Sequence, residues 1–179
     1  MAIEIPEHIE RDLQSSTTEF KYFVVINPDG DINSNSNRPI FLSSSADYLE
    51  HDGNKIVFLD RGLRLSKLQE SVDYRKKKIK ISNCSISLSN YKVGNSRLSD
   101  DLEDAYPTVS TLQEVQDGSS SSMSRVIFAI YLKTRSCKTL DDCLQLGLFK
   151  VVRYSYDEKV LTIEGMDEWL NTFSTNLPK

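Results

Sequence analysis

Two pairs of neighbouring carboxylates are the residues of this chain best suited by type and spacing to acid–base chemistry. They are Asp141-Asp142 and Asp157-Glu158, and paired carboxylates can serve as general acid and general base. The first pair falls where we expect the first turn of a short helix, whose positive end attracts acidic side chains. The second pair falls in an expected hairpin turn, where acidic residues are common. We therefore favour structural roles for both pairs and predict no catalytic residues.

A further acidic group, Asp100-Asp101 with Asp104, has the ligand type that calcium prefers. Hard cations take several carboxylate oxygens. The spacing lacks the glycine and the twelfth-position glutamate of an EF-hand loop, so it does not specify a calcium site. We predict no metal ligands in this chain.

The cysteines and histidines follow no metal or disulfide pattern. They are Cys84, Cys137, Cys143, His8 and His51. An odd number of cysteines without C-x-x-C spacing suits a protein made in a reducing cytoplasm. We expect Cys84 in the core, Cys143 on the buried face of a short helix, and Cys137 either incidental near a turn or an exposed loop thiol. Glycine-rich nucleotide loops and the G-x-S-x-G elbow are absent too, so we predict no cofactor.

The composition describes one acidic domain with room for a short arm. The chain has 179 residues and a formal net charge of −4, with a pI near 5.3, whereas domains that bind nucleic acid are usually basic. The basic run from Arg75 to Lys78 is more typical of the solvated start of a strand than of a phosphate-binding patch. No apolar run approaches the roughly 20 residues that cross a bilayer, and the first residues do not resemble a signal peptide.

Helical spacing of apolar residues predicts three short helices. The first covers residues 5–13, where Pro6 suits the first helical position. The second begins at Thr139, which can cap it, and ends by Gly147. The third lies at residues 169–173.

Strands dominate the rest of the chain. In the strand at residues 20–26, the even positions are expected to share one face, and the turn that follows is expected to hold Gly30 at a positive φ. A serine-rich stretch at residues 118–122 is expected to be flexible. Other strands or short apolar segments are expected at residues 40–42, 55–59, 63–68, 126–132, 148–154 and 159–163.

The strand at residues 78–91 changes phase in its middle. Its apolar residues occupy odd positions first and even positions later: Ile79, Ile81, Cys84, Ile86 and Leu88. Because side chains alternate faces with period two, a regular strand would turn part of this set into water. One extra residue near Ser82-Asn83, forming a β-bulge or sheet corner, would return all five to one side. Together, about seven strands and a few short helices predict a β-dominated α+β fold, a small β-barrel or sandwich.

The segment from Leu63 to Tyr91, LRLSKLQESVDYRKKKIKISNCSISLSNY, resembles the amino-terminal domain of tail-hub or baseplate-hub proteins of tailed bacteriophages. The marine and cyanobacterial phage versions in particular carry a leucine-rich lead, an ESVD-like step and a KISN-x-S-x-x-L-S-N-Y strand. Later landmarks occur in the same order, among them residues 97–100, residues 126–132 and VVRYSYDEKVLTIEGMDEW from Val151 to Trp169. The likeness spans about residues 56–179.

The resemblance implies a structural component of the phage tail that links the tail tube to the baseplate or tip. Its expected partners are other copies of itself in a ring, commonly a trimer, and the tail-tube, baseplate and tail-tip proteins. Its expected place is the virion, after assembly in the host cytoplasm. The resemblance carries over no catalytic residues, so we expect no enzyme.

The sequence leaves the division of the chain open. Residues 1–55 form either a helix-and-strand arm beside a hub-like domain at residues 56–179, or part of one continuous domain, and the whole could be the head of a longer protein. Two other functions remain as alternatives. One is a stand-alone β-sandwich that binds carbohydrate through Tyr91, Tyr106 and Tyr154, and the other is a small hydrolase that uses the acid pairs.

Overall fold

A computed structural model describes residues 5–15, 19–34, 37–51, 53–73, 78–106 and 126–167, and between residues 66 and 82 it describes the backbone alone. The helices in these residues are α1 (Glu7–Leu13) and α2 (Leu98–Ala105). The strands are β1 (Lys21–Ile26), β2 (Ile40–Ser43), β3 (Asp47–His51), β4 (Asn54–Asp60), β5 (Arg64–Asp73), β6 (Lys78–Ser89), β7 (Ile127–Lys133), β8 (Leu144–Tyr156) and β9 (Val160–Asp167).

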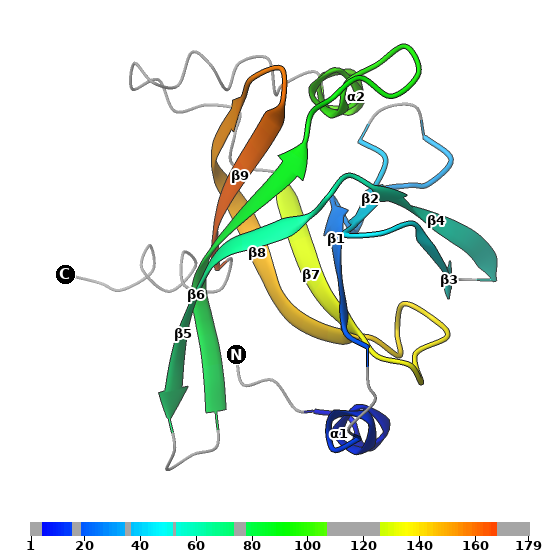
Figure 1. Ribbon diagram of the computed structural model, residues 1–179, viewed down its shortest axis with the longest axis vertical. Helices are drawn as coiled ribbons and strands as arrows, with labels where there is room; N and C mark the ends of the chain where they lie inside the picture. The colour runs from blue at the N-terminus through cyan, green and yellow to red at the C-terminus, as the bar shows by residue number, and fades with distance from the viewer. Residues whose placement is uncertain are drawn as a thin grey trace.

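These nine strands form one curved sheet in the order β3-β4-β2-β1-β7-β8-β9-β6-β5 (Figure 1). Neighbouring strands are antiparallel, except that β2 and β4 run parallel. The two helices lie at opposite ends of the view, α2 at the top and α1 at the bottom. The β-dominated α+β class predicted from the sequence is therefore confirmed.

Arg61 closes the middle of this sheet into a small barrel. Its backbone N–H donates to the carbonyl of Ser43 at the end of β2 (3.4 Å), and its carbonyl accepts the N–H of Ser89 at the end of β6 (2.6 Å). The six neighbouring strands β2-β1-β7-β8-β9-β6 therefore form a closed ring, because Arg61 connects the first of them, β2, to the last, β6. Closure satisfies backbone groups that an open sheet edge would leave unpaired.

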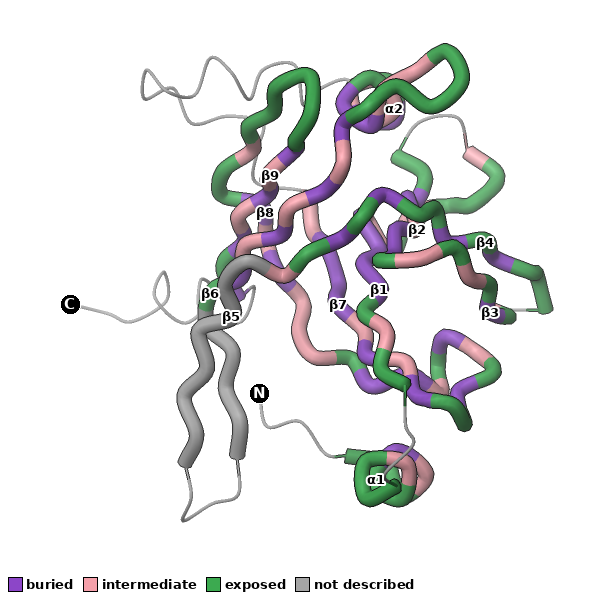
Figure 2. The backbone as a smooth tube through the Cα atoms, in the orientation of Figure 1, coloured by how far each residue is buried: buried purple, intermediate pink, exposed green. Residues whose placement is uncertain are grey.

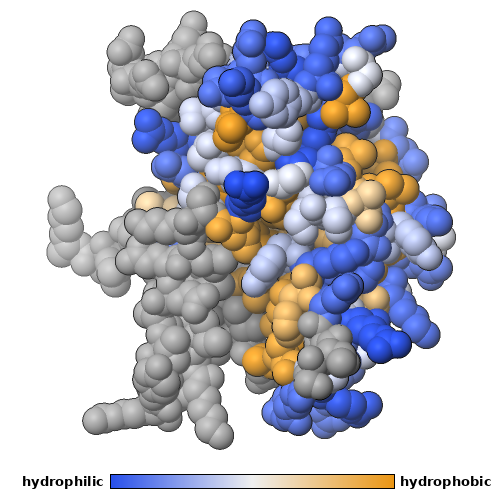
Figure 3. Space-filling view, viewed as in Figure 1, coloured by the Kyte–Doolittle hydropathy of each residue, from blue (hydrophilic) through white to orange (hydrophobic). Residues whose placement is uncertain are grey.

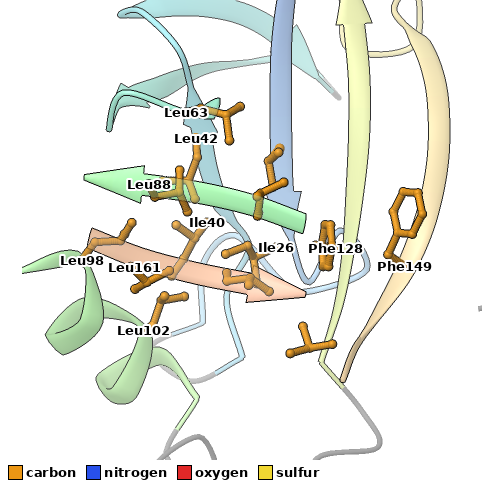
Figure 4. Packing of buried hydrophobic residues seen from close by; sticks show 14 of the residues in the cluster. Ile26, Ile40, Leu42, Leu63, Leu88, Leu98, Leu102, Phe128, Phe149 and Leu161 are labelled. Atoms are coloured by element: carbon orange, nitrogen blue, oxygen red, sulfur yellow. The ribbon is translucent and has the colours of Figure 1, made fainter. Parts of the chain in front are cut away.

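The inside of the barrel holds the larger of two hydrophobic cores. Alternate residues of β1, β2, β6, β7, β8 and β9 point into it, as the period of two in a strand requires, and α2 covers one end. Figure 4 labels Ile26, Ile40, Leu42, Leu63, Leu88, Leu98, Leu102, Phe128, Phe149 and Leu161 of this core. Burial of each such side chain contributes about 1.5–3 kcal/mol relative to exposure, so this core is the main source of stability.

A second core lies on the outer side of β1 and β7. Phe23 and Val25 of β1 belong to it, whereas Val24 and Ile26 belong to the first core. The β3–β4 hairpin covers the second core, and buried and exposed residues alternate along β4 (Figure 2). Phe23 stacks on Phe58 of β4 with ring centroids 4.1 Å apart. Strand β1 is therefore a wall between two cores.

The phase change in β6 is a β-bulge, as the sequence predicts. Gln69 of β5 pairs with Asn83, and the next residue, Glu70, pairs with Ile81, so Ser82 is the extra residue. Beyond the bulge, the side chains at Cys84, Ile86 and Leu88 are buried in the first core. The side chains of the two earlier isoleucines lie outside the described part. The prediction is confirmed for the bulge and for the three residues after it.

The helix predicted from Thr139 to Gly147 is wrong. This segment is a turn followed by the start of β8. The Asp142 carboxylate accepts the backbone N–H groups of Lys138 and Thr139 at 3.0 and 2.9 Å, and the Thr139 hydroxyl accepts the Asp142 N–H at 3.2 Å. These bonds close the turn on itself, because aspartate and threonine compete with the helix for its own backbone groups. Gly147 lies inside β8, where a Cβ would meet the Phe149 ring at 2.6 Å.

Helix α1 is present but less buried than its spacing predicts. It begins at Glu7, with Pro6 at the N-cap and not at the first helical position. Ile9 is fully buried in the second core, whereas Ile5 and Leu13 are 43% and 40% exposed. The helix therefore contacts the sheet at a single apolar residue of the predicted stripe.

The start of β1 and its following turn also differ from expectation. Phe20 and Tyr22 are 45% and 39% exposed and do not share a buried face with the later residues of β1. In the turn, Asn27 and not Gly30 has the positive φ, 55°. Glycine is required at position 30 for another reason, since a Cβ there would collide with the carbonyl oxygen of Asn37.

The sequence patterns predict neither β3 nor α2. Helix α2 buries Leu98 and Leu102, one turn apart, within a segment that is otherwise acidic. The hairpin predicted at residues 148–163 is confirmed as β8 and β9. The predicted helix at residues 169–173 and the serine-rich stretch at residues 118–122 lie outside the described residues.

We expect Gly165→Ala to destabilise the barrel, because a Cβ at this position in β9 would lie 2.5 Å from the Phe128 ring and 2.8 Å from Phe149 Cβ. Overpacking of this kind costs about 1–3 kcal/mol. Met166→Ala is the matched control, since the neighbouring Met166 is 40% exposed and its truncation should change stability by no more than about 0.5 kcal/mol. Urea unfolding measures both; an equal loss in the two variants would contradict the tight packing at Gly165.

Candidate functional site

The two predicted acid pairs do not come together. Asp142 closes the turn before β8, and Asp157 accepts the backbone N–H groups of residues 159 and 160, both at 2.7 Å. Backbone hydrogen bonds lower the pKa of both carboxyls from their ordinary value. The other member of each pair, Asp141 or Glu158, is largely exposed, at 82% and 83% of its side-chain surface. The geometry thus offers each pair a role in a turn.

The three aspartates weighed as calcium ligands lie on α2, and two of them have protein partners. Asp100 accepts the Arg97 N–H at 2.9 Å, and Asp101 Oδ2 lies 3.5 Å from Arg61 Nη2. Within the described residues, no group of three or more His, Cys, Asp or Glu side chains is arranged to hold a metal ion. The spacing along the sequence therefore does not become a ligand cluster in space.

The tyrosines proposed as a carbohydrate platform are not exposed together. Tyr91 is 57% exposed, but Tyr106 is 2% exposed and belongs to the first core. The Tyr106 hydroxyl donates to the carbonyls of Ile26 (3.3 Å) and Arg38. The hydroxyl oxygen of Tyr154 is also buried. The exposure expected of Tyr91 is confirmed and that of Tyr106 is wrong, because Tyr106 anchors α2 to the barrel.

A buried cation joins α2 to the barrel. Arg61 is 6% exposed, and its Nη1 donates to the carbonyl of Tyr91 at 3.2 Å, while Nη2 reaches Asp101 on α2. Beside it, the fully buried Asn90 accepts the Ser99 N–H in the first turn of α2 at 2.9 Å and donates to the β8–β9 turn at 2.6 Å. No sequence signal distinguishes Arg61 or Asn90 from other loop residues.

A second ionic group lies at the end of β1 and β7. Asp47, at the start of β3, is within 3.1 Å of Lys21 and of Lys133. Burial alone would raise the pKa of the Asp47 carboxyl, but hydrogen bonds from the Tyr48 N–H and from the two lysines outweigh burial and lower it. The group lines a hollow of about 420 Å³ with Glu19, Thr134 and Arg135. Asp47 thereby ties β3 to Lys21 of β1 and to Lys133 of β7.

A larger hollow lies beside the second core. It has a volume of about 520 Å³ and is walled by the loop after β1, by Phe41 and Tyr131, and by His51 and Asp141. Asp141 Oδ1 lies 3.9 Å from His51 Nδ1. Burial, and then the charges of Asp141 and Asp29, raise the pKa of the Tyr131 phenol. The hollow thus combines carboxylates and an imidazole with aromatic walls.

Cys137, Cys143 and His8 form the most chemically distinctive cluster. Cys137 is 4% exposed, so the alternative of an exposed loop thiol is wrong. Its sulfur accepts the Thr134 N–H and lies 3.4 Å from the Thr134 hydroxyl. Both its thiol (3.4 Å) and His8 Nε2 (2.9 Å) contact the carbonyl of Asp142. His8 and Cys143 are 135 positions apart in the sequence, and no sequence pattern predicts that α1 brings His8 to this segment.

The two thiols of this cluster have opposite acidities. A hydrogen bond from the Cys143 thiol, with smaller help from Thr134 and His8, lowers the pKa of Cys137 from 9.0 to about 5. The same bond, together with burial, raises the pKa of Cys143. Burial among apolar groups raises the pKa of the third cysteine, Cys84, to about 12. Neither of the two hollows described above is lined by Cys137.

Comparison with known proteins finds a structural similarity but no matching family. No family model and no curated protein matches the chain. Among solved structures, the chain is similar to a component of the "Virion of native gene transfer agent (GTA) particle", with a TM-score of 0.55 and 11% identity. The match covers 97% of this chain and 48% of that one, so the chain spans about half the length of that component. At this identity the likeness shows the fold.

Two further features of the surface are the distribution of polar residues and the two edge strands of the sheet. Figure 3 shows hydrophilic residues over α2 and α1 at opposite ends of the face, with apolar residues between them. No helix in the described part is long and apolar enough to cross a membrane. The edge of β3 is partly covered, because Glu50 exchanges backbone bonds with Lys138 (3.3 Å) and Leu140 (3.0 Å). Strand β5 is the other end of the sheet.

We expect Arg61→Met to lower the free energy of unfolding by about 2 kcal/mol, since it removes a buried cation and leaves two acceptors unpaired. The figure is below that for a fully buried pair because Asp101 is 30% exposed. Arg97→Met is the control: the Arg97 side chain is 39% exposed beside Glu158, and such a surface pair is worth less than about 1 kcal/mol. Equal effects of the two substitutions in urea unfolding would refute the role of Arg61.

The pH dependence of the Asp47 group has a defined sign. Because the folded pKa of Asp47 is lowered, its contribution to stability is present above the unfolded value, near 4, and is lost as pH falls through the folded pKa. We expect Asp47→Asn to cost about 1 kcal/mol at pH 7 and progressively less below pH 4. Urea unfolding of both proteins from pH 7 to pH 2.5 measures this difference, and a constant difference would argue against it.

Proposed function

We propose that this protein is a structural subunit of a bacteriophage-type tail, a hub component that links the tail tube to the baseplate or tip. The observation that carries the proposal is the likeness of 97% of the chain to a component of a gene transfer agent virion. It is supported by the ordered motifs from Leu63 to Trp169 that resemble tail-hub proteins. The chain would act through its surfaces, without enzyme activity, in the virion.

The β5–β6 hairpin supports assembly as the mode of action. Strand β6 pairs with β9 only from Asn83 to Ser89, whereas its pairing with β5 continues to Asp73 and Lys78. Beyond Asn83 the hairpin therefore extends past β9 as a two-stranded ribbon, visible in Figure 1. A two-stranded ribbon is only marginally stable in water by itself. A neighbouring subunit that covers it would supply the missing support.

The edge of β5 favours pairing with a second copy of the chain. Among the described strands, β5 has β6 on one side and no strand on the other. A long free edge is a template for another strand. A contact between this edge and a different surface of the next copy is head-to-tail, and such contacts close into rings when the rotation permits. We propose a ring, with three copies as the form that the tail-hub resemblance implies.

We also propose that residues 1–55 and 56–179 form one continuous domain. Strand β1 lies between β2 and β7 and pairs with β7 over its whole length, from Lys21 to Ile26. Its side chains contribute to both cores. A separable arm would expose those apolar side chains to water. The tube, baseplate and tip proteins would then meet this single body.

Replacement of residues 70–82 by the turn Asn-Gly tests the role of the ribbon. The two-residue turn joins Gln69 to Asn83, a paired position of the hairpin. We expect the shortened protein to keep its thermal unfolding temperature within a few degrees, because the deleted part makes no ladder with β9. We expect it to be monomeric, while the full chain forms a ring by native mass spectrometry.

Two outcomes would count against the proposal. A shortened chain that still forms the ring would show that the ribbon is not the interface. A full chain that stays monomeric at high concentration, and that is missing from purified particles by mass spectrometry, would end the structural-subunit proposal. Substitution of Lys55 by Gln, on the exposed face of the β3–β4 hairpin, is the control that should leave association unchanged.

A further inference from the structure

The hollow of about 520 Å³ beside the second core has a wall that is both acidic and aromatic. Asp29 and Asp31 line it from the loop after β1, and Asp141 lines it from the segment between β7 and β8. Phe41 of β2 and Tyr131 of β7 supply the aromatic part of the wall. None of the described residues that line it is a lysine or an arginine. This acidic hollow therefore combines three carboxylates with two aromatic rings.

The carboxylates of the acidic hollow are accessible from outside. Asp29 and Asp31 are exposed, and the Asp141 side chain is 82% exposed, with its Oδ1 3.9 Å from His51 Nδ1, a long distance for an ion pair. A group that fits such a hollow carries a positive charge on an apolar stem, because the charge meets carboxylates while the stem lies against aromatic rings. Lysine and arginine side chains have this form.

Acidic side chains alone do not select an occupant, but the same chain carries a matching basic segment. Residues 75–78 read Arg-Lys-Lys-Lys, and this run, the basic tip, connects β5 to β6. The last pair of the β5–β6 ribbon joins Asp73 to Lys78, whereas β6 pairs with β9 only from Asn83 onward. Four consecutive cations repel one another, so they gain from an acidic acceptor.

We propose that the acidic hollow receives the basic tip of a neighbouring copy of the chain. Within one copy the two features lie on opposite flanks: Figure 1 shows the ribbon at the lower left and the loop after β1 at the upper right. A contact between them therefore joins one copy to the next, head to tail, which is the arrangement that closes into a ring. The inference rests on the proposed function and names the surface that the ribbon meets.

Charge complementarity favours a second copy as the occupant. A single exposed ion pair contributes little to association. The contact proposed here sets three carboxylates against four cations, and it recurs at every junction of the ring. The last junction to form is intramolecular, so a weak contact at each site is enough to hold the closed ring together.

Charge reversal on each side tests this contact in the full chain. We expect Asp29→Lys with Asp141→Lys to prevent ring formation in native mass spectrometry, because the hollow then repels the basic tip. Lys76→Glu with Lys77→Glu should prevent it as well. The four substitutions combined in one chain should restore a ring of wild-type size, since the reversed charges attract each other again. Rescue of this kind requires that the two sites touch.

The matched control is Glu10→Lys with Glu158→Lys, which changes the net charge by the same amount at two exposed positions that do not line the hollow. This variant should form the ring. A ring that forms despite the reversed hollow, or a folded combined variant that forms none, would overturn the inference. The proposed function would still stand in that case if the chain without residues 70–82 is monomeric. A wild-type chain that stays monomeric would count against both.

Thermal unfolding of each variant shows whether it is folded. If the reversed chains do not fold, the salt dependence of the wild-type ring decides the matter. Charges act over about 10 Å at 0.1 M salt and over about 3 Å at 1 M, so the dissociation constant of the ring should rise about tenfold or more between these concentrations. A dissociation constant that does not change with salt would overturn the inference and leave the backbone edge of β5 as the contact.

Discussion

The buried guanidinium of Arg61 is the constraint on which the rest of the structure depends. Its backbone joins the end of β2 to the end of β6, and its side chain holds the loop after β6 and Asp101 of α2. A buried charge is costly unless it is paired and hydrogen-bonded. Closure of the barrel and docking of α2 each supply one acceptor of the cation, the Tyr91 carbonyl and the Asp101 carboxylate.

Closure of the barrel determines which side chains are buried. The barrel strands β2, β6, β8 and β9 bury apolar side chains in the first core, and β1 buries side chains in both cores. Several acidic groups have structural roles: Asp142 and Asp157 close turns, and Asp47 ties three strand ends. The contact surface proposed above instead includes backbone, at the edge of β5 and along the ribbon beyond Asn83.

The sequence predicts those parts of the fold in which one face is apolar and the other polar. The bulge at Ser82 follows from a single change of phase, and the β8–β9 hairpin from two alternating runs around an acidic turn. The helix expected from Thr139 fails because the same residues that cap a helix, Thr139 and Asp142, also close a turn on themselves. Local sequence cannot decide between these outcomes; pairing of β8 with β7 does. The burial of Arg61 and of Cys137 is not predicted for a similar reason, since it depends on partners far along the chain.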